Sequence, residues 1–225
     1  MQWPVALRFA FVALVALQAR PGAFFPAQYR SGALPAIQIQ ALGGGEVLLE
    51  ATVDEAGSVT GVRVLRTTEP FTEPTAKTVG GWRFSPAQKE VEPVPPVPAG
   101  PKPRKPVASK VLVAAVFRPP TLNTPTYGDA VKNVAAASVE TPFPTVTVQP
   151  QYPLAALYDG LVLVEVRVGV DGRVVGARVI QSAPPFDPLA LEAARAWKFS
   201  PARVDDVFTE TLAYITFGFR QPITR

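Results

Sequence analysis

The chain has 225 residues, a formal net charge of +4, and no cysteine or histidine. The missing residue types exclude disulfides, thiol nucleophiles, zinc fingers and catalytic triads that use histidine. The sequence shows no metal-ligand cluster and no phosphate-binding glycine loop, so no cofactor is expected. The 26 prolines indicate extended segments, and the scattered lysines and arginines are typical of a solvated surface, so no nucleic-acid partner is expected.

The first 19 residues have the pattern of an export signal. Arg8 is followed by the apolar run 9–17 and by Ala19, which is typical of a secretory signal peptide. The run is shorter than the about 20 apolar residues that span a membrane. We therefore predict that residues 1–19 are a signal peptide. An uncleaved membrane anchor is the main alternative, and a buried N-terminal helix is the third.

A duplication is the main organising feature of the sequence. A shift of 115 residues aligns residues 45–87 with residues 160–202 without a gap, and it superimposes WRFSPA on WKFSPA. A gapless register over about forty residues predicts two copies of one folding unit.

The second copy predicts two strands joined by a tight hairpin. Alternate residues of the segment 161–170 are valines, which is the pattern of a half-buried strand. Asp171 and Gly172 follow, and both residue types tolerate the positive φ that tight hairpins use. The return strand is expected at 173–181, with Val175, Ala177 and Val179 on its apolar face.

A helix and a third strand complete the unit. Asp187 is expected to cap a helix that begins near Leu189 and ends near Lys198. Alternating apolar residues predict the third strand at 209–219. The fold class is therefore α+β, with two ββαβ domains. Each is a three-stranded antiparallel sheet in the order 2-1-3, packed by one helix, and its third strand is a free edge.

The first copy is degraded. Its helix segment contains Pro74 and the pair Gly80-Gly81, so its helix should be shorter and looser. The expected organisation is a first domain at 35–118 with an extended proline-rich insertion at 91–107, a linker at 119–148 with a short helix at 130–139, and a second domain at 149–222. An inert loop is favoured for the insertion over a proline-motif ligand.

The repeated hexamer is interpreted as a folding signature. Trp197 is expected to pack the helix end on the sheet, Phe199 to start the return to the third strand, and Pro201 to end the helix. Trp82, Phe84 and Pro86 should do the same in the first copy.

Two charged pairs recur on neighbouring strands of the two copies. They are Glu50 with Arg63 and Glu165 with Arg178. A cross-strand ion pair is favoured over a polar patch for a partner. Among the other carboxylates, Asp171 is explained by the hairpin and Asp187 by the cap, so no enzyme activity is expected.

The second copy resembles the C-terminal domain of the TonB energy-transducer family over about 149–219. The residues that carry the resemblance are Gln149-Pro150-Gln151-Tyr152-Pro153, Gly160, Asp171 to Val174, Ser182, Phe186, Trp197, Phe199 and Pro201. The first copy matches only from about Gly45, and Ile37-Gln38 replace the Tyr-Pro pair.

The resemblance implies a periplasmic domain that adds an extended segment of an outer-membrane transporter to its sheet. Strand addition needs a free edge, and the expected edge is 211–217. The predicted partner-binding residues are Gln149, Pro150, Gln151, Tyr152 and Pro153 in the approach, and Leu212, Tyr214 and Thr216 on the third strand.

Two functional readings remain open. In the first, an exported periplasmic protein binds a partner peptide by strand addition in TonB-dependent transport; the short N-terminal run makes energy transduction doubtful. In the second, the protein is a structural adaptor whose edge strands self-associate, either as one continuous sheet or as a homodimer. The membrane would be contacted only through an uncleaved N-terminus.

Overall fold

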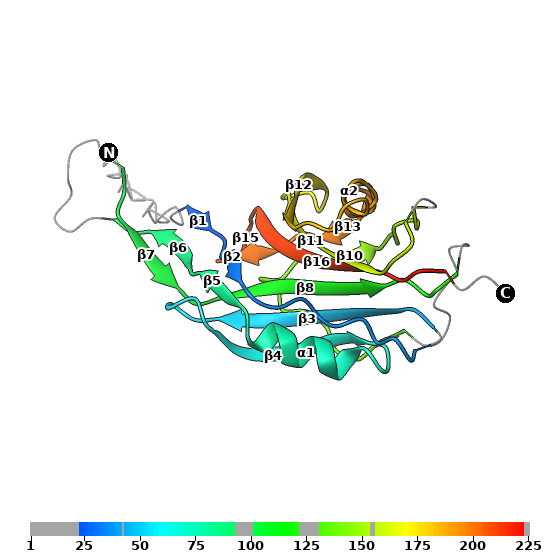
Figure 1. Ribbon diagram of the computed structural model, residues 1–225. Helices are drawn as coiled ribbons and strands as arrows, with labels where there is room; N and C mark the ends of the chain where they lie inside the picture. Colours follow the sequence, from blue (N-terminus) through cyan, green and yellow to red (C-terminus); the bar gives the residue numbers. More distant parts are fainter. Residues whose placement is uncertain (1–22, 42, 93–100, 122–130, 154–155, 223–225) are drawn as a thin grey trace, which may run out of the picture.

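Both copies of the repeat contribute to one seven-stranded sheet in the order β12-β11-β16-β8-β3-β4-β9 (Figure 1). The computed structural model describes residues 23–41, 43–92, 101–121, 131–153 and 156–222. The predicted signal peptide lies outside this range, as does part of the proline-rich insertion. The strands of the sheet are β3 Gly45–Val53, β4 Val59–Thr67, β8 Ser109–Phe117, β9 Lys132–Asn133, β11 Gly160–Val168, β12 Val174–Gln181 and β16 Thr211–Phe219.

Each copy has the predicted strand order, but the two copies do not form separate sheets. The neighbours β4-β3-β8 and β12-β11-β16 each follow the order 2-1-3 and are antiparallel. The third strands β8 and β16 then pair with each other in parallel, with Ala114 aligned to Ile215. The prediction of two three-stranded sheets is therefore wrong.

The third strands meet because they are apolar on both faces. All nine residues of β16 are buried, and Lys110 is the one residue of β8 that is not. Strands with near-continuous apolar runs are typical of positions covered on both faces. A strand of this composition at a free edge would leave part of its apolar surface in water.

The two helices lie on opposite faces of the sheet (Figure 1). Helix α1 (Thr72–Gly80) covers the first copy, and α2 (Asp187–Ala196) covers the second. The core on the α2 face extends under the first copy's strands to Leu48 and Leu112. The core on the α1 face likewise extends under the second copy to Leu163 and Tyr214. Each core therefore spans both copies.

The segment that precedes each copy covers the part of the sheet that the helix on that face leaves open. The first arm, residues 23–34, packs Ala27 and Tyr29 against the second copy's strands on the α1 face. The second arm, residues 131–148, packs Ala135 and Phe143 on the α2 face.

The remaining strands are short and lie outside the seven-stranded sheet. They are β1 Phe24–Phe25, β2 Gln28–Ser31, β5 Arg83–Ser85, β6 Ala87–Glu90, β7 Arg104–Val107, β10 Phe143–Val146, β13 Lys198–Ser200, β14 Arg203–Val204 and β15 Val207–Phe208.

The hairpin glycine contacts the repeated hexamer in both copies. The amide of Phe199 donates to the carbonyl of Gly172 at 2.9 Å, and Phe84 donates to Gly57 at 2.8 Å. Both glycines have positive φ, +79° and +83° respectively. Asp171 lies in the hairpin turn as expected, although its own φ is not positive. Its carboxylate accepts from the Arg173 amide at 3.0 Å.

Several local expectations need correction. Asp187 is the first residue of α2 and makes no side-chain cap; its carboxylate accepts from the backbone amide of Ala183 at 2.8 Å. Residues 131–139 contain β9 and no helix. Part of the proline-rich insertion is ordered as β7, which pairs with β6. Val175 is exposed because a register shift falls beside it. In the described part of the chain, no helix is long and apolar enough to cross a membrane.

Candidate partner-binding site

The predicted binding strand β16 lies in the middle of the sheet. It pairs with β11 over its whole length and with β8 from Ala213 to Gly218. The side chains of Leu212, Tyr214 and Thr216 are buried on it. The prediction that 211–217 forms a free edge is therefore wrong. Strand β16 is not an edge because it and β8 are both apolar, and each covers the other's otherwise free side.

Tyr214 connects the first arm to the second copy. Its hydroxyl donates to the Glu165 carboxylate at 3.1 Å and accepts from the Tyr29 amide at 2.8 Å. Burial raises the pKa of Tyr214 well above its usual range, and the negative charge of Glu165 raises it further. The phenol therefore stays neutral and holds the arm over β16. Gln181 adds a second link by donating to the Tyr29 hydroxyl at 2.7 Å.

The segment from Gln149 to Pro153 packs against the rest of the protein. Tyr152 is buried beside Phe186, and its hydroxyl donates toward the carbonyl of Tyr158 at 3.0 Å. The fully buried Arg118 donates to the carbonyl of Pro150 at 2.8 Å. These contacts explain the segment structurally, and its role in partner binding stays a prediction.

The tryptophans of the repeated hexamer anchor the two arms. Trp197 is buried, and its indole N–H donates to the carbonyl of Val148 at 2.9 Å. Trp82 donates in the same way to Ala33 at 2.8 Å. Val148 and Ala33 are equivalent under the shift of 115 residues, so the repeat extends upstream of Gly45. The comparison of the two copies by sequence missed this, because the arms have few identical residues and the contact that they have in common is made to a backbone carbonyl.

The two recurring charged pairs form ion pairs, as predicted. Arg63 lies 2.6 Å from Glu50, and Arg178 lies 2.6 Å from Glu165. Burial alone would raise the pKa of Glu50, but hydrogen bonds from Ser138, Thr141 and Arg63 lower it to about 2. Ser138 belongs to the second arm, so this carboxylate holds that arm on the first copy.

Strand β12 forms one outer edge of the sheet and pairs only with β11 among the described residues. Register shifts at Val175 and Ile180 leave a regular stretch at 176–179. It contains neither proline nor lysine, two residue types that commonly protect edges.

The opposite edge is more closed. Strand β9 pairs with the end of β4, and the amide of Val134 donates to the carbonyl of Leu65 at 2.9 Å. The end of β4 is therefore covered, whereas no described strand pairs with the outer side of β12. The sequence offered no signal for this difference, because β9 is two residues long and polar.

Comparison with known proteins agrees with the tandem arrangement. The family model described as Gram-negative bacterial TonB protein C-terminal matches residues 33–98 and 148–220, which together make up more than half of the chain. No curated protein matches the chain. Both matched segments begin within the arms, upstream of the first strand of each copy. The chain belongs to the TonB C-terminal family, with two copies of the domain, and is a TonB-like protein of bacterial envelope transport.

Proposed function

We propose that this protein is a non-catalytic adaptor of envelope transport, in which two TonB C-terminal units form a permanent intramolecular pair. The parallel ladder between β8 and β16 carries the proposal, because it uses the strand edges that a single unit would leave free. The two arms support it, since each bonds to strands of the other copy.

A partner segment would have to displace one third strand from the other. It would offer backbone hydrogen bonds of the same kind as those it replaced, so the exchange brings little net gain. The resident strand also belongs to the same chain and competes at an effective concentration of about millimolar or more. The adaptor therefore keeps its third strands closed to partners.

A disulfide across the ladder tests this proposal. Ala115 and Thr216 are register partners on β8 and β16, and neighbouring strands lie at a distance that a disulfide can span. The natural chain has no cysteine. The oxidised Ala115→Cys/Thr216→Cys variant should cross-link to the same envelope proteins as the reduced one. Loss of those partners on oxidation would show that the third strands open to bind.

A second candidate function is strand addition at the outer edge of β12. No described strand pairs with this side of β12, whereas β9 pairs with the end of β4, and this difference favours the β12 edge. Amides of an antiparallel strand point alternately to its neighbour and away from it, so proline is tolerated at one of Gly176 and Ala177. The proline variant that folds should no longer bind a partner peptide. If the same edge instead forms a homodimer, light scattering should show that this variant is a monomer.

We further propose that the protein is exported to the periplasm, with residues 1–19 as its signal peptide. The family's domains act in the periplasm, and the apolar run at 9–17 has the length of a signal. The intact mass of the protein from the cell envelope should correspond to a chain that starts near Arg20. A mass that includes Met1 would favour the anchored alternative.

A further inference from the structure

Two grooves on the sheet correspond to each other under the repeat. Each lies beside one of the two recurring ion pairs and is lined by the same six strand positions. In the first-copy groove these are Glu50, Thr52, Gly61, Val62, Arg63 and Lys110. In the second-copy groove they are Glu165, Arg167, Gly176, Ala177, Arg178 and Leu212. The first five match under the shift of 115 residues, and in each set the sixth residue is the register partner of the second.

The second arm covers the end of β4 and runs along the first-copy groove. Its strand β9 pairs with β4, and the amide of Val134 donates to the carbonyl of Leu65 at 2.9 Å. At the groove, the amide and the hydroxyl of Ser138 donate to the Glu50 carboxylate at 2.8 and 2.7 Å. Residues 132–138 therefore form one extended segment that binds an edge and a groove.

The described part of the first arm has no counterpart of that segment. The two arms have the same register downstream of it, since Gln28 aligns with Ser85 and Phe143 with Ser200. Under the shift of 115 residues, β9 corresponds to residues 17–18, which lie outside the described range and within the predicted signal peptide. After the export proposed above, the chain would keep no counterpart of β9.

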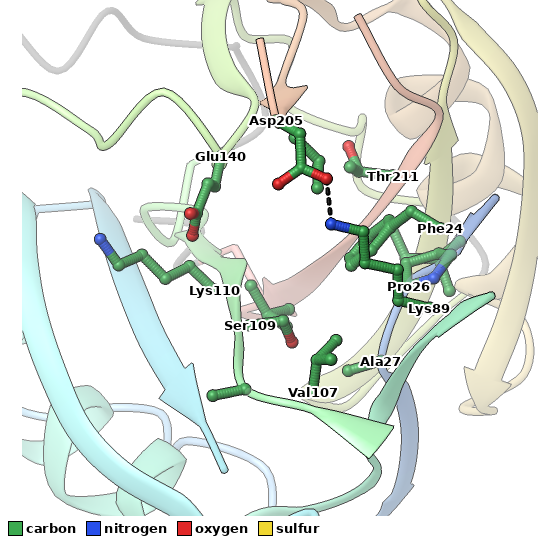
Figure 2. A pocket seen from close by; sticks show the side chains of 14 residues that line it. Phe24, Pro26, Ala27, Lys89, Val107, Ser109, Lys110, Glu140, Asp205 and Thr211 are labelled. Atoms are coloured by element: carbon green, nitrogen blue, oxygen red, sulfur yellow. Dashed lines mark hydrogen bonds and ion pairs between the residues drawn. The ribbon is translucent and has the colours of Figure 1, made fainter. Parts of the chain in front are cut away.

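The first arm meets the second copy nearer to β16. Pro26 lines both the second-copy groove and the cavity in Figure 2, where Phe24 and Ala27 lie with it near the start of β16. Among the described residues of this arm, Pro26 and Gln28 are the ones that line the second-copy groove. The end of β12 is therefore not covered by the described part of the first arm.

Side chains at the end of β12 are more exposed than their counterparts on β4. Leu65 is fully buried, whereas its counterpart Ile180 is only partly buried. Thr67 is partly buried, and its counterpart Ser182 is exposed. Both Leu65 and Ile180 lie at a register shift, but in the described part of the chain only Leu65 accepts a hydrogen bond from an arm amide. The end of β12 therefore has room for a further segment.

We propose that the end of β12 and the second-copy groove bind an extended segment of a partner protein, in the position that residues 132–138 occupy on the first copy. The inference rests on the strand addition at β12 proposed above, and it adds the register and the chemistry of the segment. Two residues of the partner would pair with Gln181 and Ser182, the counterparts of Arg66 and Thr67. The residues that follow would run along the groove.

The segment should carry small, uncharged side chains at two alternate positions after the paired residues. In the second arm these are Ala135 and Ala137, which pack against the core on the α2 face, whereas Ala136 is exposed. The second-copy groove is lined by two arginines and two glutamates that form ion pairs, so it has no net charge. A charged side chain therefore gains little from this groove.

An acetylated and amidated peptide of residues 131–139, titrated into the exported protein, tests the proposal. It should shift the amides of Ile180, Gln181 and Ser182 saturably, with a dissociation constant of roughly 0.1–5 mM. The amides at the end of β4 should not shift, because the chain's own second arm competes there at an effective concentration of about millimolar or more.

Two changes to the peptide test its chemistry. Ala137→Asp should weaken binding by about 10-fold, because it places a charge where a methyl group packs on the core. Ala136→Asp is the matched control, since Ala136 is exposed on the second arm. That peptide should bind within about 3-fold of the unchanged one.

A disulfide tests the register. Lys132 pairs with Thr67 on the first copy, so a Lys132→Cys peptide should form a disulfide with the Ser182→Cys protein in a thiol redox buffer. Val175→Cys is the matched control, because Val175 is exposed on the same strand but lies outside this register. It should form at least about 5-fold less of the cross-link.

The proposal is overturned if no saturable shift appears at β12, if the ends of β4 and β12 shift equally, or if the two cysteine variants cross-link equally. If the peptide fails to bind while a proline variant at Gly176 or Ala177 still loses its native partner, strand addition at β12 stands and the chemistry proposed for the segment is wrong. If that variant also keeps its partner, both are wrong. A dimer that the peptide dissociates in light scattering would identify the occupant as a second copy of this chain, which also overturns the proposal.

Discussion

Replacing Gly172 by alanine should lower the free energy of unfolding by about 2–4 kcal/mol. A Cβ atom built on Gly172 would lie 1.9 Å from the carbonyl oxygen of Phe199, far inside van der Waals contact. The residue also has a φ of +79°, which costs alanine about 1–2 kcal/mol. Movement that relieved the clash would weaken the hydrogen bond from Phe199 to Gly172, worth about 0.5–1.5 kcal/mol.

Urea unfolding followed by tryptophan fluorescence measures this change. Gly57→Ala should cost a similar amount, since its Cβ would lie 1.9 Å from the Phe84 carbonyl oxygen. Gly80→Ala is the control: a Cβ there meets nothing within 4 Å, and alanine favours the helix end. The reasoning is refuted if Gly172→Ala unfolds within 0.5 kcal/mol of Gly80→Ala, an interval of about the usual scatter between surface variants.

Three further predictions concern buried polar groups. Because the pKa of Glu50 is lowered from 4.5 to about 2, its carboxylate adds about 3 kcal/mol to the free energy of unfolding above pH 4.5, and this contribution is lost as the pH falls toward 2. Urea midpoints measured across this pH range should lose that part of their pH dependence in Glu50→Gln. Trp197→Ala should cost about 3–5 kcal/mol in the same assay and speed amide exchange in β10, because Trp197 holds Val148. Arg118→Met should leave the Pro150 carbonyl without its donor, cost about 1–3 kcal/mol, and speed exchange at Gln151.

The repeat, the strand order in each copy and the ion pairs were predictable from sequence. Each depends on local information: alternation of apolar residues, a helix long enough to cross over the sheet, and charged residues at matching positions. Glu165 and Arg178, for instance, face each other because the hairpin fixes their register.

The joining of the two copies was not predicted. Leu212, Tyr214 and Thr216 were predicted to bind a partner at a free edge, whereas all three are buried and the first arm packs on Tyr214. Nothing local in the sequence shows which segment covers a strand face. The composition of β8, with apolar residues at nearly every position, was the signal that a second neighbour is present.

The approach to the second copy shows the same limit. Tyr152 and Pro150 belong to a motif that carries the family resemblance, and the structure uses both for internal contacts. A motif identifies the fold without separating the residues that bind a partner from those that hold the segment in place.

The parallel pairing of β8 with β16 within one chain is the central claim. Backbone NOEs in the unmodified protein, recorded on a sample shown by light scattering to be monomeric, test it most directly. Cross-strand NOEs should appear in the register that aligns Ala114 with Ile215, and the amides of β16 should exchange slowly. Absence of these NOEs, together with fast exchange along one side of β16, would contradict the account.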